Sequence, residues 1–238
     1  MPSSEHSHKS RSPDPRSARS VASLLTTAEA LFGQRGIENV SLREIATAAG
    51  SRNNNLVQYH FGTKEGLTAA IFRSRIQQMD VRRAQMLSIA EAAGLVGDLP
   101  TLLEIICLPQ FDIANLTGHH PYPSFLLQYA RLYWRVGGGP DWTRDGVIAP
   151  ALHRTNLAMI AALTPLPRDV ARLRMQLCHF MFLEALIRWD QIDVSERVQH
   201  QILLTDTLRA AQAALVAGCP ASTRLASPFV DIFPMLAL

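Results

Sequence analysis

The segment from Ser41 to Leu67, SLREIATAAGSRNNNLVQYHFGTKEGL, constrains the fold of this chain more than any other. Ser41 and Glu44 have the spacing of a capping box, in which side chain and backbone satisfy each other at a helix start. Gly50 stands where a residue free to take positive φ ends a helix and turns the chain. We therefore predict a short helix before Gly50, with an apolar stripe formed by Leu42, Ile45, Ala46 and Ala49.

The stretch after Gly50 is unusually polar for a helix. Its apolar anchors are Leu56, Val57 and Phe61, and most of the other residues are asparagine, glutamine, tyrosine, histidine or arginine. Such a helix has little reason to form unless its outer face meets a polar partner. Two short helices with a sharp turn and a polar second helix are typical of a helix-turn-helix that reads DNA.

The residues around this motif resemble the TetR-type transcriptional regulators. The resemblance covers Leu24 to about Phe72 and is carried by AEALFGQRGIENVSLREIATAAG and YHFGTKEGLTAAIF. It implies an all-α fold, with an amino-terminal three-helix DNA-binding domain followed by a larger helical ligand-binding and dimerisation domain. It also implies that the second helix crosses the phosphate backbone and the third lies in the major groove. Between them SRNNNLVQ is one residue longer than the common pattern, so the groove register is not carried over.

The polar helix supplies the candidates for base recognition. Asparagine can bond adenine through both its amide groups, and each good bidentate contact contributes about 1–3 kcal/mol of discrimination. Asparagine also suits turns and helix caps, so at least one of the three is expected to build the turn. We predict that Ser51 or Asn53 caps the helix, and that the groove-facing residues are Asn54, Asn55 and Gln58, with Arg52 free for a guanine or a phosphate.

Phosphate contacts are expected beside these residues. By the resemblance, Tyr59, His60 and Lys64 contact phosphates, which position a protein without reading sequence. Arg43, on the solvent face of the preceding helix, is a further candidate. The whole predicted DNA-binding set is Arg43, Arg52, Asn53, Asn54, Asn55, Gln58, Tyr59, His60 and Lys64.

The charge of the chain is unevenly distributed. Residues 1–90 hold 12 Lys and Arg against 7 Asp and Glu, which gives +5, whereas residues 91–238 hold 11 against 13, which gives −2. The positive excess lies with the helix-turn-helix, as expected of a surface that faces phosphates. Residues 1–16 are predicted to be a disordered basic tail, which either lies along DNA as an arm or is simply solvated.

Several other classes of protein are not predicted. Cys107, Cys178 and Cys219 have no paired spacing, so we expect neither a disulfide framework nor a zinc site, and the reducing cytoplasm is the natural compartment. No leader is recognisable and no apolar run reaches the roughly 18 residues that span a membrane, so we expect no membrane partner. The motifs of hydrolytic, nucleotide-binding and metal sites are not recognisable, so we expect no enzyme, cofactor or metal.

Breaker residues divide the chain into helices. A DNA-binding domain is predicted over residues 17–72, with a first helix from about Ser17 to Arg35 and a long helix from Lys64 or Glu65 toward Ala92. A ligand-binding and dimerisation domain is predicted over 73–218, and an irregular apolar tail over 219–238. The helices expected in the body cover about 100–116, 124–136, 143–163, 167–189 and 195–217, the third with a kink before Pro150.

Aromatic side chains with a few polar tips predict a small-molecule pocket in this body. The same side chains are equally typical of a plain helical core, so both interpretations stay open for each of them. The candidates are Phe111, Phe125, Tyr129, Tyr133, Trp134, His153, Met159, His179, Phe182 and Trp189.

A homodimer is predicted from the geometry of DNA. One reading head touches few base pairs, so specific binding generally uses two heads about 34–36 Å apart. By the resemblance, the last two helices of each chain form a four-helix interface. The candidates are Leu177, Met181, Ile187, Ile202, Leu208 and Leu215.

These features predict a sequence-specific transcriptional regulator that binds double-stranded, palindromic operator DNA. The resemblance favours a homodimeric repressor released by a small apolar or aromatic effector, and leaves activation as a second mode. One alternative is a helical ligand-binding protein or enzyme with an incidental helix-turn-helix, and another is a helical interaction protein that does not bind DNA.

Overall fold

The regular elements of the chain are helices. A computed structural model describes residues 15–218 apart from 54, 135–145, 194 and 199, and within these residues it contains no strand. The predicted all-α class is therefore confirmed. The elements are α1 (Pro15–Arg35), α2 (Leu42–Ala48), α3 (Leu56–Phe61), α4 (Lys64–Ala92), α5 (Leu99–Cys107), the 3₁₀ helix η1 (Leu108–Ile113), α6 (Pro121–Tyr133), α7 (Pro150–Ala162), α8 (Arg168–Asp190) and α9 (Ile202–Val216).

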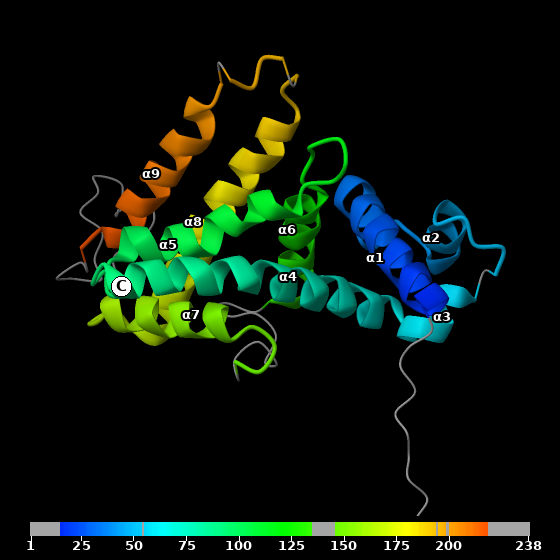
Figure 1. Cartoon of the computed structure of the whole chain (residues 1–238), viewed down its shortest axis with the longest axis horizontal. Coiled ribbons are helices and arrows are strands. Elements are labelled where there is room, and N and C mark those ends of the chain that lie inside the picture. The colour runs from blue at the N-terminus through cyan, green and yellow to red at the C-terminus, as the bar shows by residue number, and fades with distance from the viewer. Residues whose placement is uncertain (1–14, 54, 135–145, 194, 199, 219–238) are drawn as a thin grey trace, which may run out of the picture.

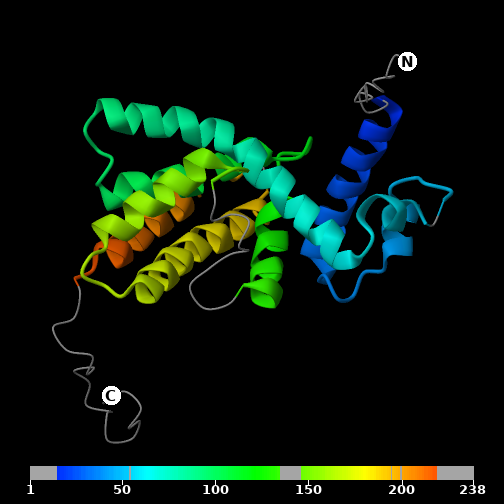
Figure 2. The same cartoon turned by 90° about the horizontal axis from the view of Figure 1, so that it is seen from below.

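The helices gather into a head and a body that α4 connects. Helices α1, α2 and α3 lie at one end of the molecule, and α5, α7, α8 and α9 lie at the other (Figure 1). The 29-residue α4 runs from the head into the body, as the view from below also shows (Figure 2). Among the described helices none is long and apolar enough to cross a bilayer.

A single hydrophobic core spans the junction between head and body. It contains Phe32 of α1 and Phe125 of α6, whose rings stack with centroids 6.3 Å apart. Gly33 lets the two helices approach, because a β-carbon there would lie only 3.1 Å from the carbonyl oxygen of Pro121. The buried carboxylate of Glu29 on α1 accepts two bonds from Arg75 of α4, at 2.6 and 2.9 Å. The head is thus held rigidly to α6 and α4.

A second core fills the far end of the body, between α5, α7, α8 and α9. The start of α7 is fixed by Asp80 on α4, whose carboxylate accepts the backbone N–H groups of Ala151 and Leu152 at 3.0 and 2.8 Å. Pro150 occupies the first helical position, where no N–H donor is needed. The helix predicted over 143–163 therefore begins only at Pro150; residues 143–145 lie outside the described residues.

Prolines also explain other differences from the predicted boundaries. Helix α1 begins at Pro15 and α6 at Pro121, each earlier than predicted, because proline suits the first turn of a helix. The helix predicted over 100–116 begins at Leu99 and tightens into η1 after Cys107, since Pro109 cannot donate a hydrogen bond to an α-helical ladder. The predicted tails, 1–14 and 219–238, lie outside the described residues.

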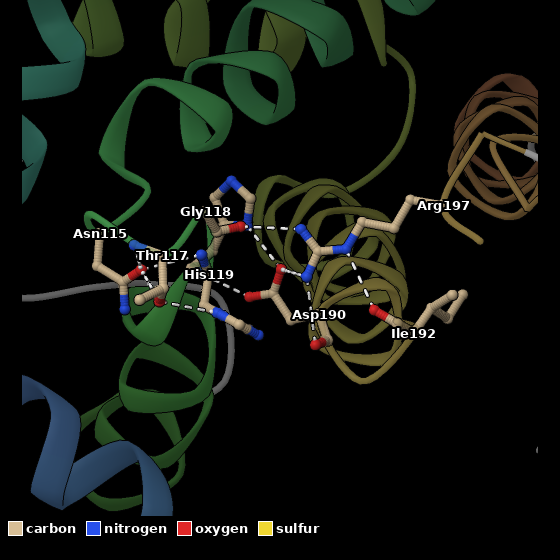
Figure 3. A network of polar contacts seen from close by, with 8 residues as sticks. Asn115, Thr117, Gly118, His119, Asp190, Ile192 and Arg197 are labelled. Carbon is tan, nitrogen blue, oxygen red and sulfur yellow. Dashed lines mark hydrogen bonds and ion pairs between the residues drawn. The ribbon is translucent and has the colours of Figure 1, made fainter. Parts of the chain in front are cut away.

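A polar network delays the start of the last helix. Figure 3 shows Asp190 and Arg197 facing each other beside the loop that carries Gly118. Arg197 donates to the carbonyl oxygens of Gly118 and Ile192 at 3.0 and 3.3 Å, and lies 3.8 Å from the Asp190 carboxylate, which also accepts from His120. These contacts hold the described residues between 195 and 201 in turns. The helix predicted from Ser195 therefore begins at Ile202.

Candidate nucleic-acid interface and ligand cavity

The predicted capping box is present at the start of α2. The Ser41 hydroxyl accepts the Glu44 backbone N–H at 3.2 Å, and the Ser41 backbone N–H donates to the Glu44 carboxylate at 2.7 Å. Arg35 adds an ion pair to Glu44 at 3.0 Å. The bond from the Ser41 backbone, followed by those from its side chain and from Arg35, lowers the pKa of Glu44 to about 2. The carboxylate is therefore ionised at the helix N-terminus, where negative charge is favoured.

The turn between α2 and α3 is built by side chains as well as by Gly50, which has φ +76°. Ser51 Oγ accepts the Asn53 N–H at 3.0 Å, and Asn53 Oδ1 accepts the Asn55 N–H at 3.0 Å. The cap position is Asn55, and its side chain makes no capping bond. The prediction that Ser51 or Asn53 caps the helix is therefore wrong, because both side chains bond within the turn. The expectation that an asparagine builds the turn is confirmed.

Helix α3 presents a polar outer face. Val57 is fully buried against the head, whereas Asn55, Gln58 and Tyr59 point outward, and 81% of Tyr59 is exposed. The rings of Tyr59 and His60 meet edge to face with centroids 5.0 Å apart. Arg52 and Asn53 are exposed in the turn, and Asn54 lies outside the described residues. The exposed side chains stay predicted base or phosphate contacts.

The three cations near this face differ in their partners. Lys64 Nζ donates to the carbonyl oxygens of Ile37 and Glu38 at 3.0 and 3.2 Å, so it fastens the start of α4 to the α1–α2 turn. An ammonium has three N–H donors, which leaves one for a phosphate. Arg43 and Arg52 are exposed, and neither guanidinium has a hydrogen-bond or ion-pair partner among the described residues. These two arginines are better placed than Lys64 to meet DNA.

A cavity of about 240 Å³ lies in the body between α4, α5, η1, α6, α7 and α8. Of the predicted pocket residues, Trp134, His153, Met159 and His179 line it. The others do not: Phe125 and Tyr129 fill the core between head and body, Phe182 fills the second core and Trp189 packs against it, and Phe111 and Tyr133 are 39% and 38% exposed. Aromatic composition alone could not separate these positions, because helical spacing is the same for core and cavity.

Most of the polar lining of the cavity was not among the predicted pocket residues. Of Arg83, Gln110, Tyr122 and Trp134, which all line the cavity, only Trp134 was a candidate, and each has a buried polar side-chain atom without a hydrogen-bond partner among the described residues. His179 lies beside Gln110, with 3.4 Å between the two nitrogens. Burial, reinforced by the charge of Arg83, lowers the pKa of His179 to about 3, so the ring is neutral at neutral pH. The cavity is therefore apolar with a few unsatisfied polar groups.

The predicted dimer residues fall into three groups. Leu177 of α8 and Ile202 at the start of α9 are 54% and 73% exposed, and Met181 is also exposed. Ile187 and Leu208 are half-buried. Leu215 is fully buried in the second core, so it cannot face a partner: α8 and α9 pack on each other and enclose it. Within the described residues, no group of three His, Cys, Asp or Glu is arranged to hold a metal ion.

Comparisons with known proteins bear on the head. Residues 24–71 match the sequence model of a family described as bacterial regulatory proteins, tetR family. No curated protein matches the chain.

Similar solved structures include a TetR-family transcriptional regulator from Pectobacterium atrosepticum (20% identity, 86% of this chain and 94% of that chain, TM-score 0.47). Another is a TetR-family regulator from Streptomyces coelicolor A3 (18% identity, 86% of this chain and 99% of that chain, TM-score 0.40). A third is a gamma-butyrolactone receptor (18% identity, 83% of this chain and 100% of that chain, TM-score 0.41). The similarity to the tetR family therefore rests on residues 24–71.

Proposed function

We propose that this chain, whose residues 24–71 form the DNA-binding domain of the tetR family of bacterial regulatory proteins, is a homodimeric transcriptional repressor that a small ligand releases from its operator. The observation that carries the proposal is the position of the cavity. Its wall includes Tyr122 and Phe72, and both also belong to the core that holds the head against α6. A ligand that moves these two side chains would therefore also change the packing between the head and α6.

DNA recognition is assigned to the outer face of α3 and to the arginines beside it. Asn55 and Gln58 are exposed, and the Asn55 side chain makes no capping bond. Their amides can therefore contact base edges in a major groove. Arg43 and Arg52 flank them with unpaired guanidinium groups that suit phosphates or a guanine. Lys64 keeps a secondary role, because its ammonium already bonds Ile37 and Glu38.

Asn55→Ala is expected to change which sequences are preferred, because it removes a base contact worth about 1–3 kcal/mol. Arg43→Ala is expected to weaken binding to all DNA sequences alike. It should also reduce the slope of log affinity against log salt concentration by about 1. Selection from a randomised DNA pool, followed by salt titrations, measures both effects. A uniform loss of affinity in both variants would contradict the division of roles.

Dimerisation is assigned to the exposed apolar faces of α8 and α9. Leu177 and Met181 lie one turn apart on α8, and Ile202 is exposed at the start of α9. Two copies that pair these faces form a four-helix contact and leave both heads free for successive major grooves. The buried Leu215 stabilises each protomer instead of the contact between them.

The double substitution Leu177→Asp with Met181→Asp is expected to give monomers, because four carboxylates would be buried at the contact without partners. Sedimentation velocity at micromolar concentration measures the change, and operator affinity should fall with it. Leu116→Asp, on a fully exposed loop side chain, is the control and should remain dimeric. A wild-type protein that sediments as a monomer would exclude this interface.

Ligand release requires coupling between the cavity and the heads. The route runs from Tyr122 in the cavity wall to Phe125 on the same helix, and from there to Phe32 in the head. A hundredfold loss of operator affinity corresponds to about 2.7 kcal/mol, which one well-filled pocket can supply.

The DNA next to the gene for this protein offers the first test of the proposal. A palindrome in that intergenic DNA should be bound by a dimer in fluorescence anisotropy, and a scrambled duplex of equal length should bind at least about 1,000-fold more weakly. Equal affinity for both duplexes would rule out an operator-specific repressor.

A further inference from the structure

A buried arginine without an anion lies in the wall of the cavity. Arg83 on α4 is 2% exposed, and no carboxylate of the described residues forms an ion pair with it. Its Nη1 and Nη2 make only long contacts, to the Ile76 carbonyl oxygen at 3.5 Å and the Met79 sulfur at 3.6 Å, and its Nε has no partner. A guanidinium keeps its charge even when burial lowers its pKa, so this charge is left without a bonded counter-ion among the described residues.

The nearby carboxylate of Asp80 is occupied elsewhere. Its two oxygens accept the first backbone N–H groups of α7, from Ala151 and Leu152. Asp80 therefore attracts Arg83 through space but does not bond it. No Asp or Glu is among the described residues that line the cavity. The described residues therefore offer Arg83 no carboxylate that bonds it directly.

The other unsatisfied buried atoms converge on the same cavity. Tyr122 Oη and Trp134 Nε1 can donate hydrogen bonds, and the amide of Gln110 bonds His179 through one of its two ends only. All four residues with such atoms line this one cavity, and the donors predominate. Buried polar groups are almost always satisfied in folded proteins, so a set of donors left free around one space indicates a missing acceptor.

The rest of the wall is apolar and limits the size of an occupant. Leu103, Ile106, Leu126 and Met159 are buried side chains in the lining. A cavity of about 150 Å³ holds benzene, so about 240 Å³ holds a molecule of about ten non-hydrogen atoms. On the side of α8, Arg172 also lines the cavity and is partly exposed. The charged side chains among the described lining residues, Arg83 and Arg172, are therefore both positive.

We propose that the effector is a monocarboxylate with a compact apolar body of about ten non-hydrogen atoms, whose carboxylate pairs with Arg83 and accepts bonds from Tyr122 and Trp134. This inference rests on the proposed ligand-responsive function and specifies its ligand class. The carboxylate supplies the anion that Arg83 lacks, and the apolar body fills the space between α4, α5, α6 and α7.

Isothermal titration calorimetry with named probes tests the proposal on the full-length protein. Phenylacetate and octanoate have the required size and charge, phenylacetamide is the neutral counterpart, and acetate is an anion without an apolar body. Phenylacetate is expected to bind at least about 10-fold more tightly than phenylacetamide, because a bond to a charged group is the stronger one. Acetate should bind weakly. Equal affinity for phenylacetate and phenylacetamide, or no binding of either acid at millimolar concentration, would overturn the proposal.

Arg83→Met isolates the charge. It is expected to weaken phenylacetate binding by about 10- to 150-fold and to leave phenylacetamide binding little changed. It should also raise the Tm of the ligand-free protein, since a buried charge without a bonded counter-ion is replaced by an apolar side chain of similar length. Arg82→Met, one residue away with an exposed side chain paired to Asp112, is the matched control and should leave phenylacetate binding unchanged. Equal losses in the two variants would overturn the assignment.

Tyr122→Phe provides a second variant that keeps the fold, because the hydroxyl it removes has no partner. This variant is expected to weaken phenylacetate binding by about 3- to 10-fold. Asp141 and Asp145 lie outside the described residues, so their double replacement by asparagine is tested as well. If this double variant binds phenylacetate as the wild type does, the ligand carboxylate is the anion that pairs with Arg83. If it binds phenylacetate more tightly, Asp141 or Asp145 competes for Arg83, and the proposal is overturned.

The same samples separate this inference from the proposed function. If phenylacetate binds through Arg83 but operator affinity does not change, the carboxylate site stands and ligand-controlled release fails. If phenylacetamide binds as tightly and releases the operator, release stands and the carboxylate site is refuted.

Discussion

Phe125→Ala is expected to lower the free energy of unfolding by about 3–5 kcal/mol, the range found when a buried phenylalanine is truncated in a core that cannot collapse around the space. Phe125 is fully buried, and its ring lies between Phe32 of α1 and Tyr122 and Tyr129 of α6. The loss therefore falls on the joint between head and body. Urea unfolding followed by circular dichroism measures it.

Phe111→Ala is the matched control for this prediction. Phe111 is the same residue type on η1, but 39% of it is exposed, so its truncation should cost much less. Operator affinity should suffer more in Phe125→Ala than in Phe111→Ala, because only Phe125 belongs to the core that supports the head. Similar losses of stability in the two variants would contradict the assignment of Phe125 to this joint.

Gly66→Ala is expected to disrupt the junction between α3 and α4. Gly66 lies in the first turn of α4, where a β-carbon would overlap the carbonyl oxygen of Phe61 at the end of α3. That oxygen is part of the backbone and cannot move aside like a flexible side chain. Overpacking of this kind lowers the free energy of unfolding by about 1–3 kcal/mol or more. Here we also expect it to rotate α3 against α4.

The comparison variant is Gly97→Ala. Nothing lies within 4 Å of a β-carbon at Gly97, and its backbone does not require positive φ, so alanine should be tolerated there. Thermal unfolding should separate the two variants, and operator binding should be lost in Gly66→Ala alone. Normal operator affinity in Gly66→Ala would show that α3 is not held by this contact.

The head could be predicted from sequence because its signals are local. The bonds between Ser41 and Glu44 span three residues, and the φ of Gly50 ends α2 where the sequence indicates. The error in this region concerned the turn: the side chains of Ser51 and Asn53 accept backbone N–H groups within the turn and not from the first turn of α3. A cap and a side-chain turn use the same residue types, so composition does not distinguish them.

The cavity could not be predicted from sequence because its features depend on distant contacts. Arg82 and Arg83 are neighbours of identical type, yet Arg82 pairs with Asp112 at the surface and Arg83 is buried. Likewise the start of α9 depends on Arg197 bonding Gly118, which is 79 residues away. The packing of α4 against α5, η1, α6 and α7, and of α8 against α6 and α7, decides which side chains line the cavity.

The central claim is that a ligand in the cavity lowers the affinity of the protein for operator DNA. The most direct test of this claim is a reciprocal titration. Operator affinity is measured by fluorescence anisotropy with and without saturating phenylacetate, and phenylacetate affinity by calorimetry with and without saturating operator. The expected result is a loss of roughly 5- to 150-fold, equal in both directions as thermodynamic linkage demands. An operator affinity that is the same with the cavity filled or empty would contradict the claim.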